Sequence, residues 1–198
     1  LPPKLAQILI NLCGPLPAGS RILDPFCGTG VILQEALLMG YQTCGTDLNP
    51  RMIEYTEKNL NWLLETQKQH FRRHSSQLGV NSNKPSNDEY RQEHEQKCRF
   101  STNTGDATSF QWTPPIDGIA CEAYLGKPMS TIPSEIKLKA EKQYCKTIIL
   151  GFLKNLSNQI KKDTPVVIAV PAWLRNDGTY SRLDLFASPE ELHSEATL

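Results

Sequence analysis

Two acidic residues and two glycines near the start of the chain have types and spacing suited to ligand binding. Asp24 ends a short apolar segment and is followed by Gly28 and Gly30, and Asp47 ends a second such segment. Glycines that follow a strand allow positive φ and let the backbone approach a ligand closely. In an open α/β sheet, ligands bind at the carboxyl ends of the strands. A carboxylate at the end of the second strand can accept both hydroxyls of a ribose, so these residues predict a site for an adenosine-containing ligand.

The same loop lacks the features that hold a phosphate group. A dinucleotide-binding loop requires a third glycine at position 33, which is Leu33, and the P-loop pattern G-x-x-x-x-G-K-[ST] occurs nowhere. A zwitterionic ligand suits a loop that begins with a carboxylate, because Asp24 could attract an ammonium group directly or through water. S-adenosylmethionine meets both requirements, so it is the expected cofactor.

Helices and strands are predicted to alternate around this loop. Strands are expected at residues 21–24, 41–46, 98–101, 116–121 and 165–170, and helices at residues 5–12, 31–39, 50–64 and 134–162. The alternation implies a parallel sheet with right-handed crossovers. The expected fold is therefore a single α/β domain over residues 1–198, with a doubly wound, mostly parallel sheet.

Two expectations concern the last part of this sheet. Residues 165–170 are almost continuously apolar, as in a strand that is covered on both faces. The tail after Trp173 is short for the final antiparallel hairpin that usually completes such a sheet.

A polar segment at about residues 67–97 interrupts the pattern. It is rich in Gln, Asn, Ser, Glu, Lys and Arg and has few apolar anchors, which predicts a mobile insertion. Its histidines and basic residues are interpreted as solvated side chains, in preference to a metal site or a phosphate-binding group. They are His70, His74, His94, Lys68, Arg72 and Arg73.

The composition excludes several classes of protein. The chain has 21 basic and 21 acidic residues, so no global charge indicates a nucleic-acid partner, although a local basic face is compatible with a neutral total. No apolar run approaches the ~20 residues that span a bilayer, and the first residues lack the plan of a signal peptide. None of the six cysteines forms a C-x-x-C pair. We expect reduced, structural cysteines, no metal and a cytoplasmic location.

Three segments resemble motifs of one known family. The group is that of the THUMP-associated RNA methylases, class I methyltransferases that include the tRNA guanine-N2 methyltransferases acting on position 10. The first segment resembles the signature D-P-[FVM]-x-G-[ST]-G, and the others resemble the second and third motifs of the family. They are Asp24-Pro25-Phe26-Cys27-Gly28-Thr29-Gly30, Gly45-Thr46-Asp47-Leu48-Asn49-Pro50 and Gly105-Asp106-Ala107.

The resemblance implies roles for individual residues. Asp47 would bind the ribose hydroxyls, Asp106 would hold the adenine amino group, and Ala107 would lie beside the ring. The complete set implied to bind the cofactor is Asp24, Phe26, Gly28, Thr29, Gly30, Asp47, Leu48, Asp106 and Ala107. The expected partner is RNA, most simply tRNA, bound through a separate N-terminal domain that this chain lacks.

The fourth motif departs from the family pattern [DN]-P-P-[YF]. In that pattern the acid or amide and a proline carbonyl accept hydrogen bonds from the target amine, and the aromatic ring stacks on the base. Here Glu122, Ala123 and Tyr124 occupy the corresponding place. We expect Glu122 to orient the amine and Tyr124 to stack on the base, with guanine N2 of tRNA as the substrate. Two alternatives remain: an adenine-N6 DNA or other S-adenosylmethionine-dependent methyltransferase, or a non-catalytic partner that keeps the donor site.

Simpler structural roles stand beside these assignments. Asp24 could only cap its loop and Asp106 could only stabilise a turn. Glu122 could be a solvated strand end, and Tyr124 could belong to the core.

Overall fold

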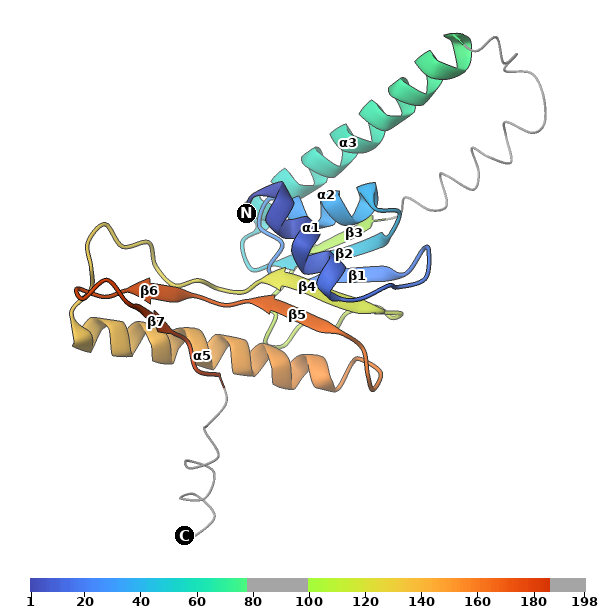
Figure 1. Cartoon of the computed structure of the whole chain (residues 1–198). Helices are drawn as coiled ribbons and strands as arrows, with labels where there is room; N and C mark the ends of the chain where they lie inside the picture. Colours follow the sequence, from blue (N-terminus) through green and yellow to red (C-terminus); the bar gives the residue numbers. More distant parts are fainter. Residues whose placement is uncertain (78–99, 186–198) are drawn as a thin grey trace.

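The central feature of the chain is a five-stranded parallel sheet. The computed structural model describes residues 1–77 and 100–185. The sheet has the order β3-β2-β1-β4-β5, and all four strand pairs are parallel (Figure 1). Its strands are β1 (Arg21–Asp24), β2 (Gln42–Asp47), β3 (Phe100–Thr104), β4 (Gly118–Glu122) and β5 (Val166–Ala169). The order reverses direction between β1 and β4, as in the class I methyltransferase fold, which confirms the predicted doubly wound sheet.

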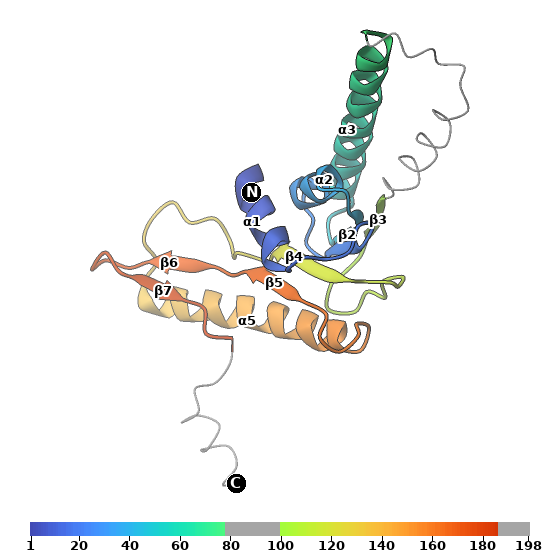
Figure 2. The same cartoon turned by 45° about the vertical axis from the view of Figure 1, so that its right-hand side comes forward.

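The helices lie on both faces of the sheet because successive side chains of a strand point to opposite faces. In Figures 1 and 2, α1 (Pro3–Leu12), α2 (Val31–Leu38) and α3 (Pro50–Gln77) lie on one side of the sheet and α5 (Glu135–Ser157) lies on the other. Ile22 of β1 faces the first side and Leu23 faces the second, where it packs with Phe152.

Helix α3 is longer than predicted. It continues to Gln77, so residues 67–77 of the predicted polar insertion are helical. Glu, Gln, Lys and Arg are good helix formers, and a helix that extends away from the sheet requires no apolar face there (Figure 1). The rest of the insertion, including His94, lies outside the described residues, as do Cys98 of the predicted strand 98–101 and the side chains of His74, Arg72 and Arg73.

Strand β5 is less covered than predicted. Its apolar residues are half-buried or exposed, and Val166 is 37% exposed. The reason is its place at the edge of the five-stranded sheet, where only β4 pairs with it. Both faces are nevertheless partly covered, because Val167 packs against the cluster of α1 and α2 and Ile168 packs against that of α5. The cover is less complete than predicted, because an apolar run does not distinguish a central strand from an edge strand.

A final antiparallel hairpin is present despite the short tail. Strands β6 (Ala172–Leu174) and β7 (Tyr180–Arg182) pair directly, with Trp173 opposite Ser181. Trp173 and Ser181 lie on the same face of the hairpin, and both are buried. Trp173 packs in one apolar cluster with Ile149 of α5. The hairpin therefore forms a separate two-stranded sheet beside α5.

Candidate active site

The loop between β1 and α2 has a backbone conformation that requires glycine. Gly28 has φ +52° and Gly30 has φ +83°, values that other residues adopt only with strain. At Gly30 a side chain is also excluded by packing, because its Cβ would lie 2.8 Å from Cγ2 of Thr56. At Gly28 a Cβ would have no neighbouring atom within 4 Å. The second glycine thus lets the loop pack on α3, whereas the first presents open backbone.

Asp47 fastens this loop to the end of β2. Its Oδ2 accepts a hydrogen bond from the Gly28 backbone N–H at 2.9 Å, and its Oδ1 accepts one from Asn49 N–H at 2.8 Å. A carboxylate offers about four acceptor positions, so each oxygen keeps one for a ligand. Leu48 beside it is 71% exposed, an apolar side chain at the strand end that a flat ring could cover. Thr29 is also exposed.

Two residues of α3 that the sequence analysis did not identify hold the loop from the other side. Thr56 is fully buried, and its Oγ1 donates to the Gly28 carbonyl at 2.7 Å. Nδ2 of Asn59 donates to the Thr29 carbonyl at 2.9 Å. Their three-residue spacing places both on one helix face. That spacing was the available signal, but it does not tell which loop the face meets.

Asp24 is a buried carboxyl group with like charges nearby. It is 2% exposed, and its Oδ1 accepts a hydrogen bond from Phe26 N–H at 3.1 Å. Burial raises the pKa of Asp24 to about 8; the Phe26 hydrogen bond opposes this rise, and the charges of Asp47 and Glu122 add to it. The ends of β1, β2 and β4 therefore bring three carboxyl groups together, which is an environment suited to a cationic ligand.

The third predicted motif lies next to this group. Gly105 N–H donates to the Asp47 carbonyl at 3.0 Å, so the loop after β3 is joined to the end of β2. Asp106 is exposed, and its Oδ1 accepts hydrogen bonds from Thr108 N–H at 2.9 Å and Thr108 Oγ1 at 2.7 Å. Asp106 therefore stabilises a turn, and its Oδ2 has no hydrogen-bond partner among residues 1–77 and 100–185. Ala107 is buried beneath it.

Phe26 has its ring in the core. The ring packs edge-on against Phe152 of α5, with 5.3 Å between centroids. Its predicted contact with the cofactor stays a prediction, and its side chain serves the packing of α5 on the sheet.

The buried thiols near the site are not nucleophiles. Burial raises the pKa of Cys27 and of Cys121, which keeps both protonated at neutral pH. The five described cysteines are free and buried, as predicted. Among the described residues, no group of three or more His, Cys, Asp and Glu side chains could hold a metal ion.

The loop after β4 is held by side chains of α5. Glu122 is half-buried at the strand end, and Ala123 continues the pairing by donating its N–H to the Ala169 carbonyl at 3.0 Å. The ring of Tyr124 meets that of Tyr144 edge-on at 5.7 Å. Oε1 of Glu141 accepts the Lys127 backbone N–H at 2.8 Å. Helix α5 thus positions a loop that lacks the prolines of the family pattern.

Comparison with known proteins agrees with this arrangement. The methyltransferase domain described as RMKL-like matches residues 1–143, which is more than half of the chain. The chain belongs to this family. The methyltransferase domain therefore includes the glycine loop, the carboxyl ends of β1 to β4 and the start of α5.

Curated relatives match a shorter part of the chain. A tRNA (guanine(10)-N2)-dimethyltransferase of Methanothermobacter thermautotrophicus is 59% identical over 58 residues, which is 29% of this chain and 17% of that protein. The protein of the same name from Pyrococcus abyssi is 44% identical over 62 residues, 31% of this chain and 18% of that protein. The matches thus span less than a fifth of these relatives.

Solved structures support the fold. The glycopeptide N-methyltransferase MtfA superimposes with a TM-score of 0.50 at 10% identity, covering 84% of this chain and 52% of that one. This similarity concerns the fold alone.

In the described part of the chain, no helix is both long enough and apolar enough to cross a membrane.

The residues of the donor side fit S-adenosylmethionine, the cofactor of class I methyltransferases. The backbone at Gly28 is open, and the buried carboxyl of Asp24 lies where it could bind an ammonium group. Asp47 keeps acceptor positions for two hydroxyls. The carboxylates of Asp24 and Asp47 would repel a phosphate group placed beside them.

Proposed function

We propose that this chain transfers a methyl group from S-adenosylmethionine to the exocyclic N2 amine of a guanine in tRNA. The observation that carries the proposal is the parallel pairing of β1 with β4, which places Glu122 at the same edge of the sheet as Asp24; the charge of Glu122 also contributes to the raised pKa of Asp24. It brings the acid at the end of β4 to the donor side, so a base amine bound by Glu122 would lie next to the cofactor. The printed names of the relatives supply the choice of guanine N2 and tRNA.

The donor would be held by three carboxylates with different partners. Asp24 would bind the ammonium group, and Asp47 would accept the ribose hydroxyls with its two remaining acceptor positions. Asp106 would accept the adenine amino group through Oδ2, while Leu48 covers the ring. S-adenosylmethionine supplies an electrophilic methyl carbon on a sulfonium.

The target amine would be oriented by the loop after β4. A carboxylate oxygen of Glu122 accepts one N2–H, which turns the nitrogen toward the methyl carbon, and can take the proton that the nitrogen loses after transfer. Tyr124 stacks on the base, and Tyr144 fixes the plane of its ring. Catalysis then consists mainly of positioning and exclusion of water. A tRNA substrate also agrees with the cytoplasmic location expected from the cysteines.

The test is incubation of the chain with S-adenosylmethionine and an unmodified tRNA transcript, followed by mass spectrometry of the nucleosides. We expect methylated N2 of guanosine, and its loss when inosine, which lacks this amine, replaces the guanosine at position 10. Glu122→Gln should lower kcat by about 100-fold or more and leave the affinity for the cofactor unchanged in calorimetry.

Other outcomes would replace the proposal. Methylated adenine in duplex DNA, with none in tRNA, would show the alternative enzyme. Cofactor binding without transfer to either nucleic acid would show the non-catalytic partner.

A further inference from the structure

Two cationic side chains meet at one hydroxyl group beside the loop after β4. Nζ of Lys142, on α5, donates to Oγ of Ser181 at 3.2 Å. Nη2 of Arg175, at the turn of the β6–β7 hairpin, donates to the same oxygen at 3.3 Å. Ser181 is buried with 5% exposure, because it lies opposite Trp173 on the inner face of the hairpin.

These three side chains present donors and no free acceptor. A hydroxyl oxygen has two acceptor positions, and both are used, so the O–H of Ser181 is left to donate. No acceptor for this O–H is found among the residues that the structure describes. Lys142 and Arg175 retain further N–H groups, and the pair carries two positive charges with a neutral group between them.

Nearby carboxylates do not form ion pairs with these two side chains in the described part of the chain. Asp177 attracts Arg175 electrostatically, but its Oδ1 accepts hydrogen bonds from Thr179 N–H and Thr179 Oγ1 and forms no ion pair with Arg175 among the described residues. Glu141 accepts the backbone N–H of Lys127. Two like charges held at one oxygen are unfavourable by themselves, and an anion placed between them would remove that cost.

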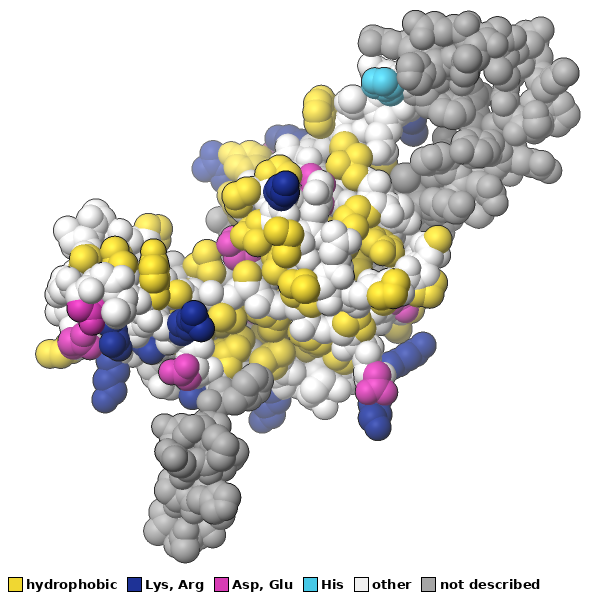
Figure 3. All heavy atoms as spheres, viewed as in Figure 1, with side chains coloured by type: hydrophobic (Ala, Val, Ile, Leu, Met, Phe, Trp, Pro, Cys, Tyr) yellow, Lys and Arg dark blue, Asp and Glu magenta, His cyan; other side chains and the backbone are white. Residues whose placement is uncertain are grey.

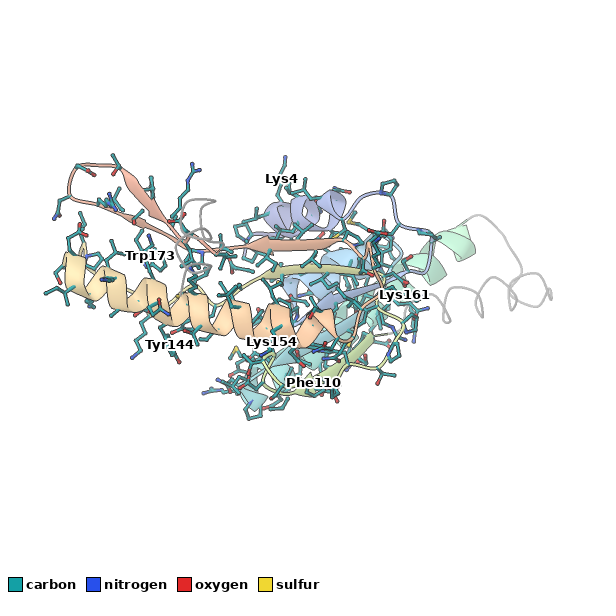
Figure 4. All side chains as sticks on the ribbon, turned by 90° about the horizontal axis from the view of Figure 1, so that it is seen from below. Lys4, Phe110, Tyr144, Lys154, Lys161 and Trp173 are labelled. Carbon is teal, nitrogen blue, oxygen red and sulfur yellow. The ribbon has the colours of Figure 1, made fainter. Side chains whose placement is uncertain are left out.

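The hairpin contacts the loop that would bind the target base. Trp173 and Leu183 pack in one apolar cluster with Ala123, against which Tyr124 lies. Figure 4 shows Trp173 between the hairpin and α5, toward the same end of the helix as Tyr144. Figure 3 shows Lys and Arg side chains, interspersed with a few acidic ones, over the hairpin and the adjacent end of α5.

We propose that Lys142, Arg175 and Ser181 bind a phosphate group of the RNA backbone close to the target nucleotide. The proposal rests on the proposed function for its choice of ligand. A guanidinium and an ammonium group are the usual partners of a phosphate, and the serine hydroxyl adds a third donor. The phosphate contact would fix the register of the RNA so that one base reaches Tyr124.

The test measures the affinity for an unmodified tRNA transcript by fluorescence anisotropy at salt concentrations from about 50 to about 200 mM. Lys142→Gln and Arg175→Gln should each weaken binding about tenfold and lower the slope of log K against log salt by about 1. The double variant should lower the slope of log K against log salt by little more than either single variant does, because both side chains bind the same phosphate.

Matched variants separate this site from a general effect of charge. Lys154→Gln removes an exposed lysine from the other end of the same helix (Figure 4) and should leave the slope unchanged. Lys142→Arg and Arg175→Lys keep the charges and should retain most of the affinity, which a variant with a misfolded hairpin would not. A double variant that binds tRNA no more weakly than Lys154→Gln would overturn the proposal.

The same measurements distinguish failure of this site from failure of the proposed function. RNA binding does not require methyl transfer. If the chain methylates nothing but the variants lower the slope of log K against log salt, the phosphate site is supported and the proposed reaction is contradicted. Methylation of tRNA by a chain whose variants show unchanged slopes would support the proposed reaction and overturn the phosphate site. A wild-type chain that does not bind tRNA contradicts both.

Discussion

The donor side and the substrate side of the candidate site are built in different ways. On the donor side, backbone groups of one loop are hydrogen-bonded by Asp47 and Thr56, which follow the loop within three secondary-structure elements. On the substrate side, the loop after β4 is held by side chains of α5 and packs near a hairpin from the end of the chain. The difference suggests that a fixed donor geometry is combined with a substrate loop whose details can vary.

The loss of Asp47 should have the largest effect. Asp47→Ala removes two hydrogen bonds to backbone N–H groups and the acceptors for the ribose. At about 1.5–3 kcal/mol for each hydrogen bond to a charged group, the affinity for S-adenosylmethionine should fall at least about 100-fold in calorimetry. Asp47→Asn keeps one acceptor oxygen and should lose less. Unchanged affinity in the alanine variant would refute the donor site.

The two glycines provide a matched test of how the loop is fastened. Gly30→Ala combines a positive φ with a contact to Thr56 and should lower the free energy of unfolding by about 2–4 kcal/mol. Gly28→Ala has the strain without the contact and should cost about 1–2 kcal/mol. Chemical denaturation measures both. Equal losses in the two variants would show that packing on α3 is not what restricts position 30.

The buried carboxyl of Asp24 should make cofactor binding depend on pH. Its pKa of about 8 means that it is mostly protonated near pH 7, so it must lose a proton before it can bind an ammonium group. From pH 6 to about 7.5 the ammonium keeps its own proton, and the affinity should rise by up to about tenfold per pH unit. Asp24→Asn should bind more weakly, with a flat profile. A wild-type profile as flat as that of the variant would contradict this coupling.

The same pKa predicts the effect of pH on stability, in the opposite direction. The folded carboxyl holds its proton more tightly than the unfolded one, so the ligand-free chain should lose stability as pH rises from about 4 to about 8. Asp24→Asn should remove this contribution. Its Tm at pH 8 should therefore exceed that of the wild type by about 2–4 °C for each kcal/mol gained.

The aromatic contact on the substrate side should have the smallest effect. Tyr144→Leu removes an edge-on ring contact worth about 0.5–1.5 kcal/mol. The KM for tRNA should rise up to about tenfold, while the affinity for S-adenosylmethionine stays constant. Tyr144→Phe keeps the ring and serves as the control. A change in cofactor affinity in the leucine variant would show that the two sides are not separate.

The proline pattern of the family is not simply restored in this chain. The Ala123 N–H pairs with the Ala169 carbonyl, and a proline at position 123 would lack that N–H. Ala123→Pro would therefore weaken the pairing of β4 with β5, although it would bring the sequence closer to the family motif.

The sequence by itself determined the features that depend on local backbone geometry. Positive φ at Gly28 and Gly30, a carboxylate at the ends of the first two strands, and the alternation of strands and helices all leave local signals. These sufficed to predict the doubly wound, mostly parallel sheet and the glycine loop, whereas the cofactor-binding roles of the individual residues stay predictions. The length of α3 was underestimated because a polar helix without an apolar stripe has no periodic signal.

Only the tertiary structure decided which distant side chains meet. The contacts of Thr56 with the glycine loop, of Tyr144 with Tyr124, and of Lys142 with Ser181 join residues from different elements. The ring of Phe26 lies in the core, and β5 lies at an edge. The physical reason is that the crossing of helices over a sheet depends on packing of the whole core, whereas a strand end or a glycine bend depends on a few adjacent residues.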